Sequence, residues 1–191
     1  MNERNHMLIT GEPGIGKTTL IMNLCKELKD MHPAGFYTAE KREAGIRSGF
    51  ELLSLNGIRG ILAHVDISSP FRVSKYGVDV EGFESFLDAI TSHIRTASII
   101  IIDEIGKMEC FSTKFRSLIM DIINSDRILI ATIALKGGGM IADVKKRHDV
   151  KLFRINLENR NSLGSEILHE IKDIGERHVR NHRKNKRSTN C

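Results

Sequence analysis

The chain has 191 residues, 40% of them hydrophobic, which is enough to bury one sizeable core and fits a single domain. No run approaches the roughly 20 consecutive apolar residues that a membrane-spanning helix needs, and the first ten residues lack the apolar centre of a secretion signal. We therefore expect a soluble, cytoplasmic protein that does not associate with membranes. Cys25, Cys110 and Cys191 lie far apart in the sequence, so they predict neither a disulfide framework nor a zinc site.

The formal net charge of +5 is concentrated at the C-terminal end. Residues 176–191 contain six Lys or Arg and one acid, which leaves 23 basic and 23 acidic residues elsewhere. We expect one folded domain at residues 1–175 and a basic, disordered tail at residues 176–191. Such a tail can contact nucleic acid, but most are solvated extensions, so we expect no nucleic-acid partner.

Taken in chain order, the hydrophobic periodicity predicts strands that alternate with helices. The strands are expected at residues 6–10, 35–40, 46–55, 57–65, 98–103, 127–134 and 151–156, and the helices at 17–31, 81–94, 113–124, 140–147 and 162–174. Residues 68–76 are expected to form a loop. This order predicts an α/β fold of three layers, in which a mostly parallel sheet is flanked by helices. Residues 35–55 are expected to add a β-hairpin at the edge of that sheet.

The sequence GEPGIGKT at residues 11–18 follows an apolar strand, opens a helix and matches the pattern GxxxxGK[ST]. Its glycines permit backbone conformations that turn successive N–H groups inward, which makes a concave anion site at a helix N-terminus. Lys17 is expected to reach the β and γ phosphates of a nucleotide, and Thr18 to offer its hydroxyl to Mg²⁺. The motif therefore predicts the phosphate-binding loop of a P-loop NTPase fold.

A second motif, IIIIDEIGKM, begins at residue 99 and places two carboxylates at the end of a buried strand. Asp103 is expected to complete the Mg²⁺ shell beside the phosphate-binding loop. Glu104 points the other way from the strand end, so it is the candidate general base that activates the attacking water. Residues 103–106 also fit the short DxxG pattern of switch GTPases, but no guanine-reading motif accompanies it.

Phosphoryl transfer depends mainly on electrostatic stabilisation, so cations near the motifs are further candidates. We consider Lys107 and Arg147 first, because each follows an element expected at the active side. The other candidates are Arg42, Arg47 and Arg160.

The chain resembles the THEP-type family of small nucleoside-triphosphatases over nearly all of the body before the basic tail. The resemblance is carried by GEPGIGKTTL, GFYTAEKREAGIRSGF, KYGVDVEGFE, IIIDEIGKMECFS, KGGG and RHDVKLFRINLENRN. It implies a P-loop domain that hydrolyses several nucleoside triphosphates with Mg²⁺ and without strong base preference, diphosphates being poorer substrates. Nothing in the resemblance extends to the tail.

The resemblance also implies two nucleotide-contacting stretches. Together with the motif argument, the expected nucleotide-binding residues are Gly11, Glu12, Pro13, Gly14, Ile15, Gly16, Lys17, Thr18, Thr19, Ile100, Ile101, Ile102, Asp103, Glu104, Ile105, Gly106 and Lys107.

Two other functions remain open at this point. A small-molecule or nucleoside kinase uses the same loop to move phosphate to an acceptor other than water, and the fold alone does not exclude it. A nucleotide-dependent switch acting on RNA or DNA through the tail is the third reading. Hydrolysis is favoured because Glu104 is placed to activate water.

Overall fold

The computed structural model describes residues 5–188, with side chains described as far as Arg177. Within this range nine strands form one sheet in the order β5-β6-β4-β3-β2-β7-β8-β1-β9. The strands are β1 (His6–Thr10), β2 (Ala34–Glu43), β3 (Ile46–Ser54), β4 (Arg59–His64), β5 (Arg72–Val73), β6 (Tyr76–Val78), β7 (Ile99–Ile105), β8 (Ile128–Ile133) and β9 (Val150–Arg154).

The half of the sheet made by β2, β7, β8, β1 and β9 is parallel. Its central strands are continuous apolar runs because both of their faces are covered. Along β7, Ile99 and Ile101 enter one core cluster, whereas Ile100 and Ile102 enter the cluster on the other face. This alternation is the two-residue period of a strand, and all four side chains are fully buried.

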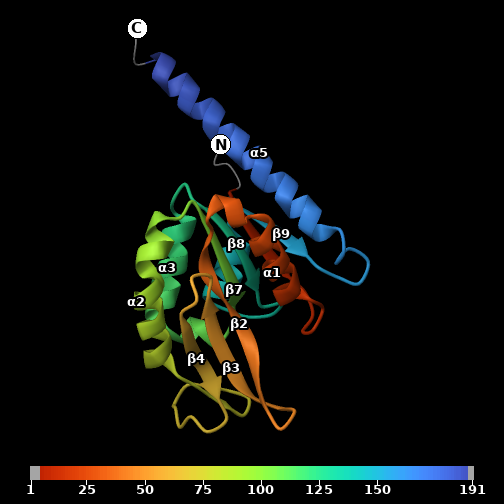
Figure 1. Ribbon diagram of the computed structural model, residues 1–191, viewed down its shortest axis with the longest axis vertical. Helices are drawn as coiled ribbons and strands as arrows, with labels where there is room; N and C mark the ends of the chain where they lie inside the picture. The colour runs from red at the N-terminus through yellow and green to blue at the C-terminus, as the bar shows by residue number, and fades with distance from the viewer. Residues whose placement is uncertain (1–4, 189–191) are drawn as a thin grey trace.

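Helices cover both faces of the sheet, which confirms the predicted three-layer α/β architecture (Figure 1). Helices α1 (Lys17–Glu27) and α5 (Leu163–Ser188) contribute to one core cluster, and α2 (Val80–Thr96), α3 (Thr113–Ile123) and α4 (Met140–Lys145) to the other. Two 3-10 turns, η1 (Lys29–Met31) and η2 (Glu109–Phe111), follow α1 and β7. Side-chain caps fix the starts of α2 and α3: Asp79 accepts a bond from the backbone of Gly82, and Ser112 accepts one from that of Phe115.

The β2–β3 hairpin lies on one side of the parallel strands but is not the outermost part of the sheet. Strand β2 pairs in parallel with β7, while β4, β6 and β5 continue the sheet beyond β3 with antiparallel pairing. The expected loop at residues 68–76 therefore contains β5 and the first residue of β6. These strands have two and three residues, too few to show a period in the sequence.

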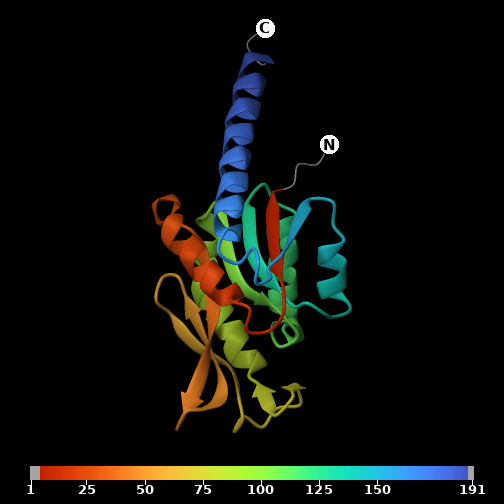
Figure 2. The same cartoon turned by 90° about the vertical axis from the view of Figure 1, so that its right-hand side faces the viewer.

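Helix α5 is longer than predicted. We expected it to end at Ile174 and a disordered tail to follow, but its backbone remains helical to Ser188 (Figure 2). After Gly175 the sequence contains neither Gly nor Pro up to that residue, and Arg and Lys are good helix formers, so nothing local ends the helix. Residues 189–191 lie outside the described part of the chain, and the domain boundary at residue 175 stays a prediction.

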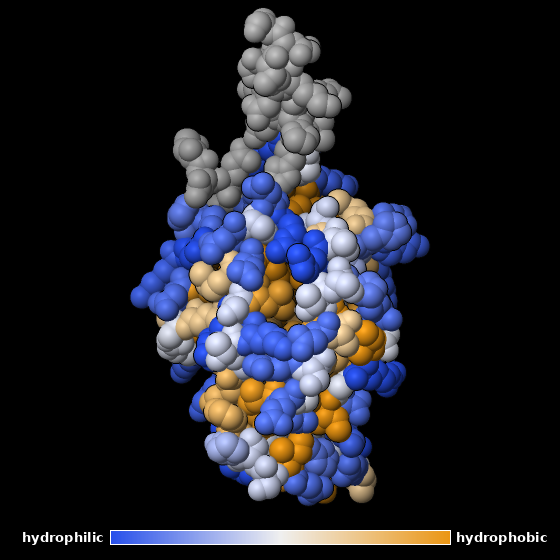
Figure 3. Space-filling model, turned by 90° about the vertical axis from the view of Figure 1, so that its left-hand side faces the viewer, coloured by the Kyte–Doolittle hydropathy of each residue, from blue (hydrophilic) through white to orange (hydrophobic). Residues whose placement is uncertain are grey.

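The outer surface over α2 and α3 is mostly hydrophilic, with separate apolar areas in its middle and toward the end farther from the C-terminus (Figure 3). None of the helices in residues 5–188 combines the length and apolarity that crossing a bilayer requires.

Candidate active site

The phosphate-binding loop joins the end of β1 to the start of α1, as the sequence predicts. Gly14 and Gly16 have φ angles of 75° and 109°, a left-handed region that favours glycine. Gly16 is also the N-cap of α1. At Gly11 a β-carbon would lie 2.7 Å from the carbonyl oxygen of Ile155, so the loop passes too close to the neighbouring backbone for any side chain there. The loop conformation therefore depends on glycine at each of these positions.

Lys17 is the first residue of α1, and its side chain folds back over the loop. The Nζ atom donates hydrogen bonds to the carbonyl oxygens of Gly11 at 3.1 Å and of Glu12 at 3.3 Å. A cation and the N-terminal end of a helix thus meet at one point, which is the electrostatic arrangement that attracts phosphate.

Asp103 lies near the end of β7 and is only 1% exposed. Its Oδ1 accepts a hydrogen bond from the hydroxyl of Thr132 on β8, whereas its buried Oδ2 has no hydrogen-bond partner among the described residues. Burial raises the pKa of this carboxyl, while the Thr132 and Thr18 hydroxyls and the Lys17 ammonium act to lower it. A buried carboxylate with an unused oxygen is therefore present beside the phosphate-binding loop.

Glu104 is partly exposed and lines the cleft next to the loop. Burial is the largest influence and raises the pKa of its carboxyl; Asp103 raises it further, and Lys17 and Lys145 lower it. Lys145, at the end of α4, donates from Nζ to the carbonyl oxygens of Ala134 at 2.5 Å and Leu135 at 3.0 Å. Lys145 thus holds the segment after β8 against the site.

The cleft has a cavity volume of about 670 Å³ and lies between the phosphate-binding loop and the β2–β3 hairpin. One wall is the phosphate-binding loop with Glu104 and residues 134–136. The other wall comes from β2 and β3, through Thr38, Ala39, Glu40, Arg47 and Phe50. This volume is within the usual range for small-molecule sites and is large enough for a nucleotide.

The structure divides the expected nucleotide-binding residues into two groups. Residues 11–19 line the cleft apart from Ile15, which packs against the core on the α1 side. In the second stretch only Glu104 lines it, with Asp103 buried behind. Ile100, Ile101, Ile102 and Ile105 are fully buried core residues, and neither Gly106 nor the exposed Lys107 is among the lining residues.

Arg147 does not reach the site, so we withdraw it as a phosphate-binding cation. Its guanidinium pairs with the carboxylate of Asp149, at 2.9 Å from Nε and 2.6 Å from Nη2. The carbonyl of Asp149 accepts from the backbone N–H of His6, the first residue of β1, whereas the phosphate-binding loop follows the last. Arg147 therefore sits at the opposite end of the parallel strands.

Among the other candidate cations, Arg47 alone lines this cleft. Arg42 bonds to Glu40 and to the carbonyl oxygen of Gly45 within the hairpin. Arg160 lines an adjoining cavity on the far side of the loop, together with Gly14, Gly16 and Thr19.

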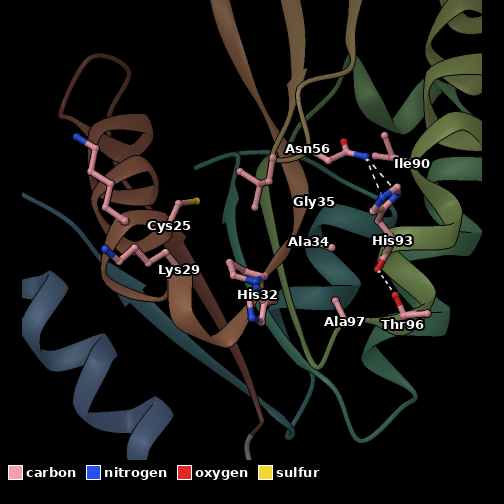
Figure 4. Close-up of a pocket in the computed structure, with 13 residues that line it drawn as sticks. Cys25, Lys29, His32, Ala34, Gly35, Asn56, Ile90, His93, Thr96 and Ala97 are labelled. Atoms are coloured by element: carbon pink, nitrogen blue, oxygen red, sulfur yellow. Dashed lines mark hydrogen bonds between the residues drawn. The ribbon is translucent and has the colours of Figure 1, made fainter.

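A larger cavity, of about 790 Å³, lies between the end of α1 and the end of α2 (Figure 4). His32 and Lys29 lie on the α1 side of it, and the Asn56 amide is 3.2 Å from the ring of His93 on the α2 side. Its lining contains neither a residue of the phosphate-binding loop nor a carboxylate. The candidate active site is therefore the smaller cleft, which brings both motifs together.

Comparisons with known proteins show the family to which the chain belongs. The family model described as NTPase matches residues 6–168. The nucleoside-triphosphatase THEP1 of Thermotoga sp. (strain RQ2) is 44% identical over 167 residues, which are 87% of this chain and 95% of that protein. The human cancer-related nucleoside-triphosphatase is 36% identical over 179 residues, covering 85% of this chain and 94% of that one.

Two solved structures share the fold. The crystal structure of THEP1 from Aquifex aeolicus superposes with a TM-score of 0.80 at 34% identity and covers 87% of this chain and 98% of that chain. The solution structure of the human cancer-related nucleoside triphosphatase gives a TM-score of 0.75 at 34% identity, with 88% and 98% covered. The matches confirm the resemblance to the THEP-type proteins, and this chain belongs to the NTPase family, a group of P-loop hydrolases.

Proposed function

We propose that this chain hydrolyses ATP, GTP, CTP and UTP to the diphosphate and phosphate in a Mg²⁺-dependent reaction. The observation that carries the proposal is the meeting of the phosphate-binding loop, Lys17 and Glu104 in one cleft. The family's name for its relatives, nucleoside-triphosphatase, points to the same reaction.

The loop and Lys17 supply the binding of phosphate in this account. The inward N–H groups and the N-terminus of α1 bind the phosphate chain, and the Lys17 ammonium moves from the loop carbonyls to the β and γ oxygens. A diphosphate has no γ-phosphate for Lys17 to contact, so we expect it to be a weaker substrate.

Thr18 and Asp103 are the residues that would hold Mg²⁺. The unpaired Oδ2 of Asp103 and the Thr18 hydroxyl that influences its pKa are hard oxygen donors, which fit this cation. When bound, the ion neutralises charge that builds up on the phosphate oxygens. Thr132 keeps the carboxylate oriented by its bond to Oδ1.

Glu104 takes the proton of the attacking water. Glu104 lines the cleft while the preceding Asp103 is buried, so Glu104 can accept a proton from water while Asp103 binds the metal ion. Burial raises the pKa of Glu104, which makes it a stronger base than an exposed glutamate.

Broad base specificity is supported by what the cleft recognises. The loop and Lys17 contact the phosphates and Asp103 the metal ion, and these parts are the same in the Mg²⁺ complexes of all four nucleotides. Phe50 is an aromatic residue of the cleft lining, and stacking of a base on an aromatic ring tolerates any base.

The proposal is tested by phosphate release from the four triphosphates, each with Mg²⁺ and with a chelator. We expect release from all four with Mg²⁺ and loss of release with the chelator. Release from one triphosphate alone would contradict the broad specificity. Transfer of labelled phosphate to added nucleosides, without release of free phosphate, would show that the protein is a kinase and not a hydrolase.

A further inference from the structure

We infer that Arg47 is the cation that the hairpin supplies to the triphosphate, and that Glu40 stays paired with it until the nucleotide binds. The inference rests on the proposed function and names a phosphate-binding residue on the wall opposite Lys17. Arg47, Glu40 and Lys17 all line the same cleft, although they come from different elements.

Arg47 is held in place by its neighbours on the hairpin and on β6. Its Nε donates to the hydroxyl of Tyr76 at 2.9 Å, and its Nη1 donates to Oε1 of Glu40 at 2.8 Å. The guanidinium carbon lies 5.4 Å from the centre of the Phe50 ring and 5.8 Å from that of Tyr76. Aromatic rings at this distance orient a guanidinium without neutralising it.

The guanidinium keeps donors for a ligand. Its Nη2 donates no hydrogen bond to any described residue, and the Arg47 side chain is 45% exposed. Arginine presents its donors in a planar fork that matches two phosphate oxygens. Arg47 therefore combines a fixed position in the cleft wall with a donor nitrogen, Nη2, that no described residue uses.

Glu40 divides its two oxygens between two arginines. Oε1 accepts from Arg47, while Oε2 accepts from Nη2 of Arg42 at 2.6 Å. Arg42 and Arg47 are direct partners across the hairpin, where like charges repel, so the carboxylate also keeps the pair together. The three side chains carry a net charge of +1, which leaves the group attractive to an anion.

The Glu40–Arg47 pair is easily exchanged for a phosphate. Exposed ion pairs contribute little to stability, and the Glu40 side chain is 40% exposed. A triphosphate carries several negative charges on one molecule, so it outcompetes a single carboxylate for the guanidinium. Glu40 remains paired with Arg42 after the exchange, and no buried charge is left alone.

Variants of Arg47, with one arginine outside the cleft as a control, separate this role from a structural one. We expect Arg47→Ala to lower kcat roughly 100-fold or more, because charge stabilisation in phosphoryl transfer depends on such a cation. Arg47→Lys should recover only part of this, since an ammonium lacks the planar fork. The matched control is Arg59→Ala, which removes an exposed arginine from the same sheet outside the cleft lining and should leave kcat within about threefold of wild type.

Two further variants test the role of Glu40 and the choice of cation. Glu40→Gln removes the competing charge, so KM for Mg·ATP should fall. Lys136 also lines the cleft, on the wall that includes Glu104. If Lys136→Ala abolishes turnover while Arg47→Ala and Arg47→Lys retain it, the inference is overturned. An Arg47→Ala variant that melts well below wild type would be replaced by Arg47→Lys for the decision.

Failure of this inference is distinguishable from failure of the proposed function. Wild-type turnover with an equally active Arg47→Ala protein would leave hydrolysis standing and overturn the role of Arg47. If the wild type shows no turnover, binding of a non-hydrolysable Mg·ATP analogue decides. Affinity at least tenfold weaker in Arg47→Ala, and unchanged in Arg59→Ala, would support the inference, whereas equal affinities in wild type and Arg47→Ala would overturn it.

Discussion

Glu109 is a buried acid, 5% exposed, that lies in η2 directly behind the site. Its Oε2 accepts a hydrogen bond from the backbone N–H of Gly106 at 3.1 Å. Burial, with smaller contributions from Glu104 and Asp103, raises its pKa from 4.5 to about 8. The folded protein therefore binds a proton at Glu109 that the unfolded chain releases near pH 4.5.

This difference predicts that stability falls as pH rises. Below pH 4.5 Glu109 is protonated in both the folded and the unfolded protein, and its contribution to the free energy of unfolding is fully present. Between pH 4.5 and about 8 this contribution is progressively lost, because only the unfolded chain releases the proton. The shift corresponds to roughly 5 kcal/mol of unfolding free energy. We expect the free energy of unfolding of Glu109→Gln to fall less with pH than that of wild type, and to be higher than that of wild type above pH 8. Urea unfolding over a range of pH, with a chelator present to remove metal ions, would measure this.

The exposed Glu158 provides a matched control, because Glu158→Gln should leave the pH profile as in wild type. A Glu109→Gln profile that declines as steeply as the wild-type profile would contradict the prediction.

Site residues within the two motifs were predictable because each motif is local in sequence. The pattern GxxxxGK[ST] fixes Lys17 and Thr18 relative to one loop, and the end of an apolar run locates Asp103 and Glu104. Thr132, Lys145 and the choice of Arg47 among the candidate cations were not predictable. They reach the site from other strands and helices, and a polar side chain after a strand is too common a signal to single them out.

Strand β2 enters the sheet at a position that only glycine permits. Gly35 has a φ of 138°, and a β-carbon there would lie 1.8 Å from the carbonyl oxygen of Ile101 on β7. We expect Gly35→Ala to destabilise the protein by about 3 kcal/mol or more, because the β2–β7 pairing must open. Thermal and urea unfolding would measure this.

Gly175 in α5 offers the opposite case. A β-carbon there meets nothing within 4 Å, and the residue lies inside a helix, so Gly175→Ala should stabilise by about 0.5 to 1 kcal/mol. If both alanine variants changed the unfolding free energy equally, the backbone argument for Gly35 would be wrong.

The elements with a clear period were predictable, and those decided by neighbouring chain segments were not. Helix α2 and strand β7 lie within two residues of their predicted bounds because each has a strong apolar pattern. The position of the hairpin within the sheet depends on the pairing of β2 with β7. Hydrophobic periodicity does not predict such a contact between segments that are distant in the sequence. The end of α5 was missed because Gly175 resembles a helix stop.

At the scale of the molecule, the loop after β1, the end of β7 and the segment after β8 supply one wall of the cleft, and the β2–β3 hairpin supplies the opposite wall. The α5 side chains Leu163, Ile167, Ile171 and Ile174 are buried in the core on the α1 side. These anchors all precede residue 175. The fold around the cleft therefore depends on the first part of α5.

Removal of residues 176–191 should accordingly leave the body intact. We expect the shortened protein to melt within about 3 °C of wild type and to release phosphate at the same rate, since no described anchor is lost. Differential scanning calorimetry and a phosphate assay would measure both. Salt-sensitive RNA binding by the full chain, lost on truncation, would instead favour the switch reading of the tail.

The most direct test of the proposed reaction is to measure Mg·ATP affinity and phosphate release for wild type, Glu104→Gln and Lys17→Ala side by side. The account predicts that Glu104→Gln binds within about threefold of wild type but releases phosphate at least 100-fold more slowly, whereas Lys17→Ala loses affinity or turnover. Phosphate release by Glu104→Gln at the wild-type rate would contradict the assignment of Glu104 as the general base.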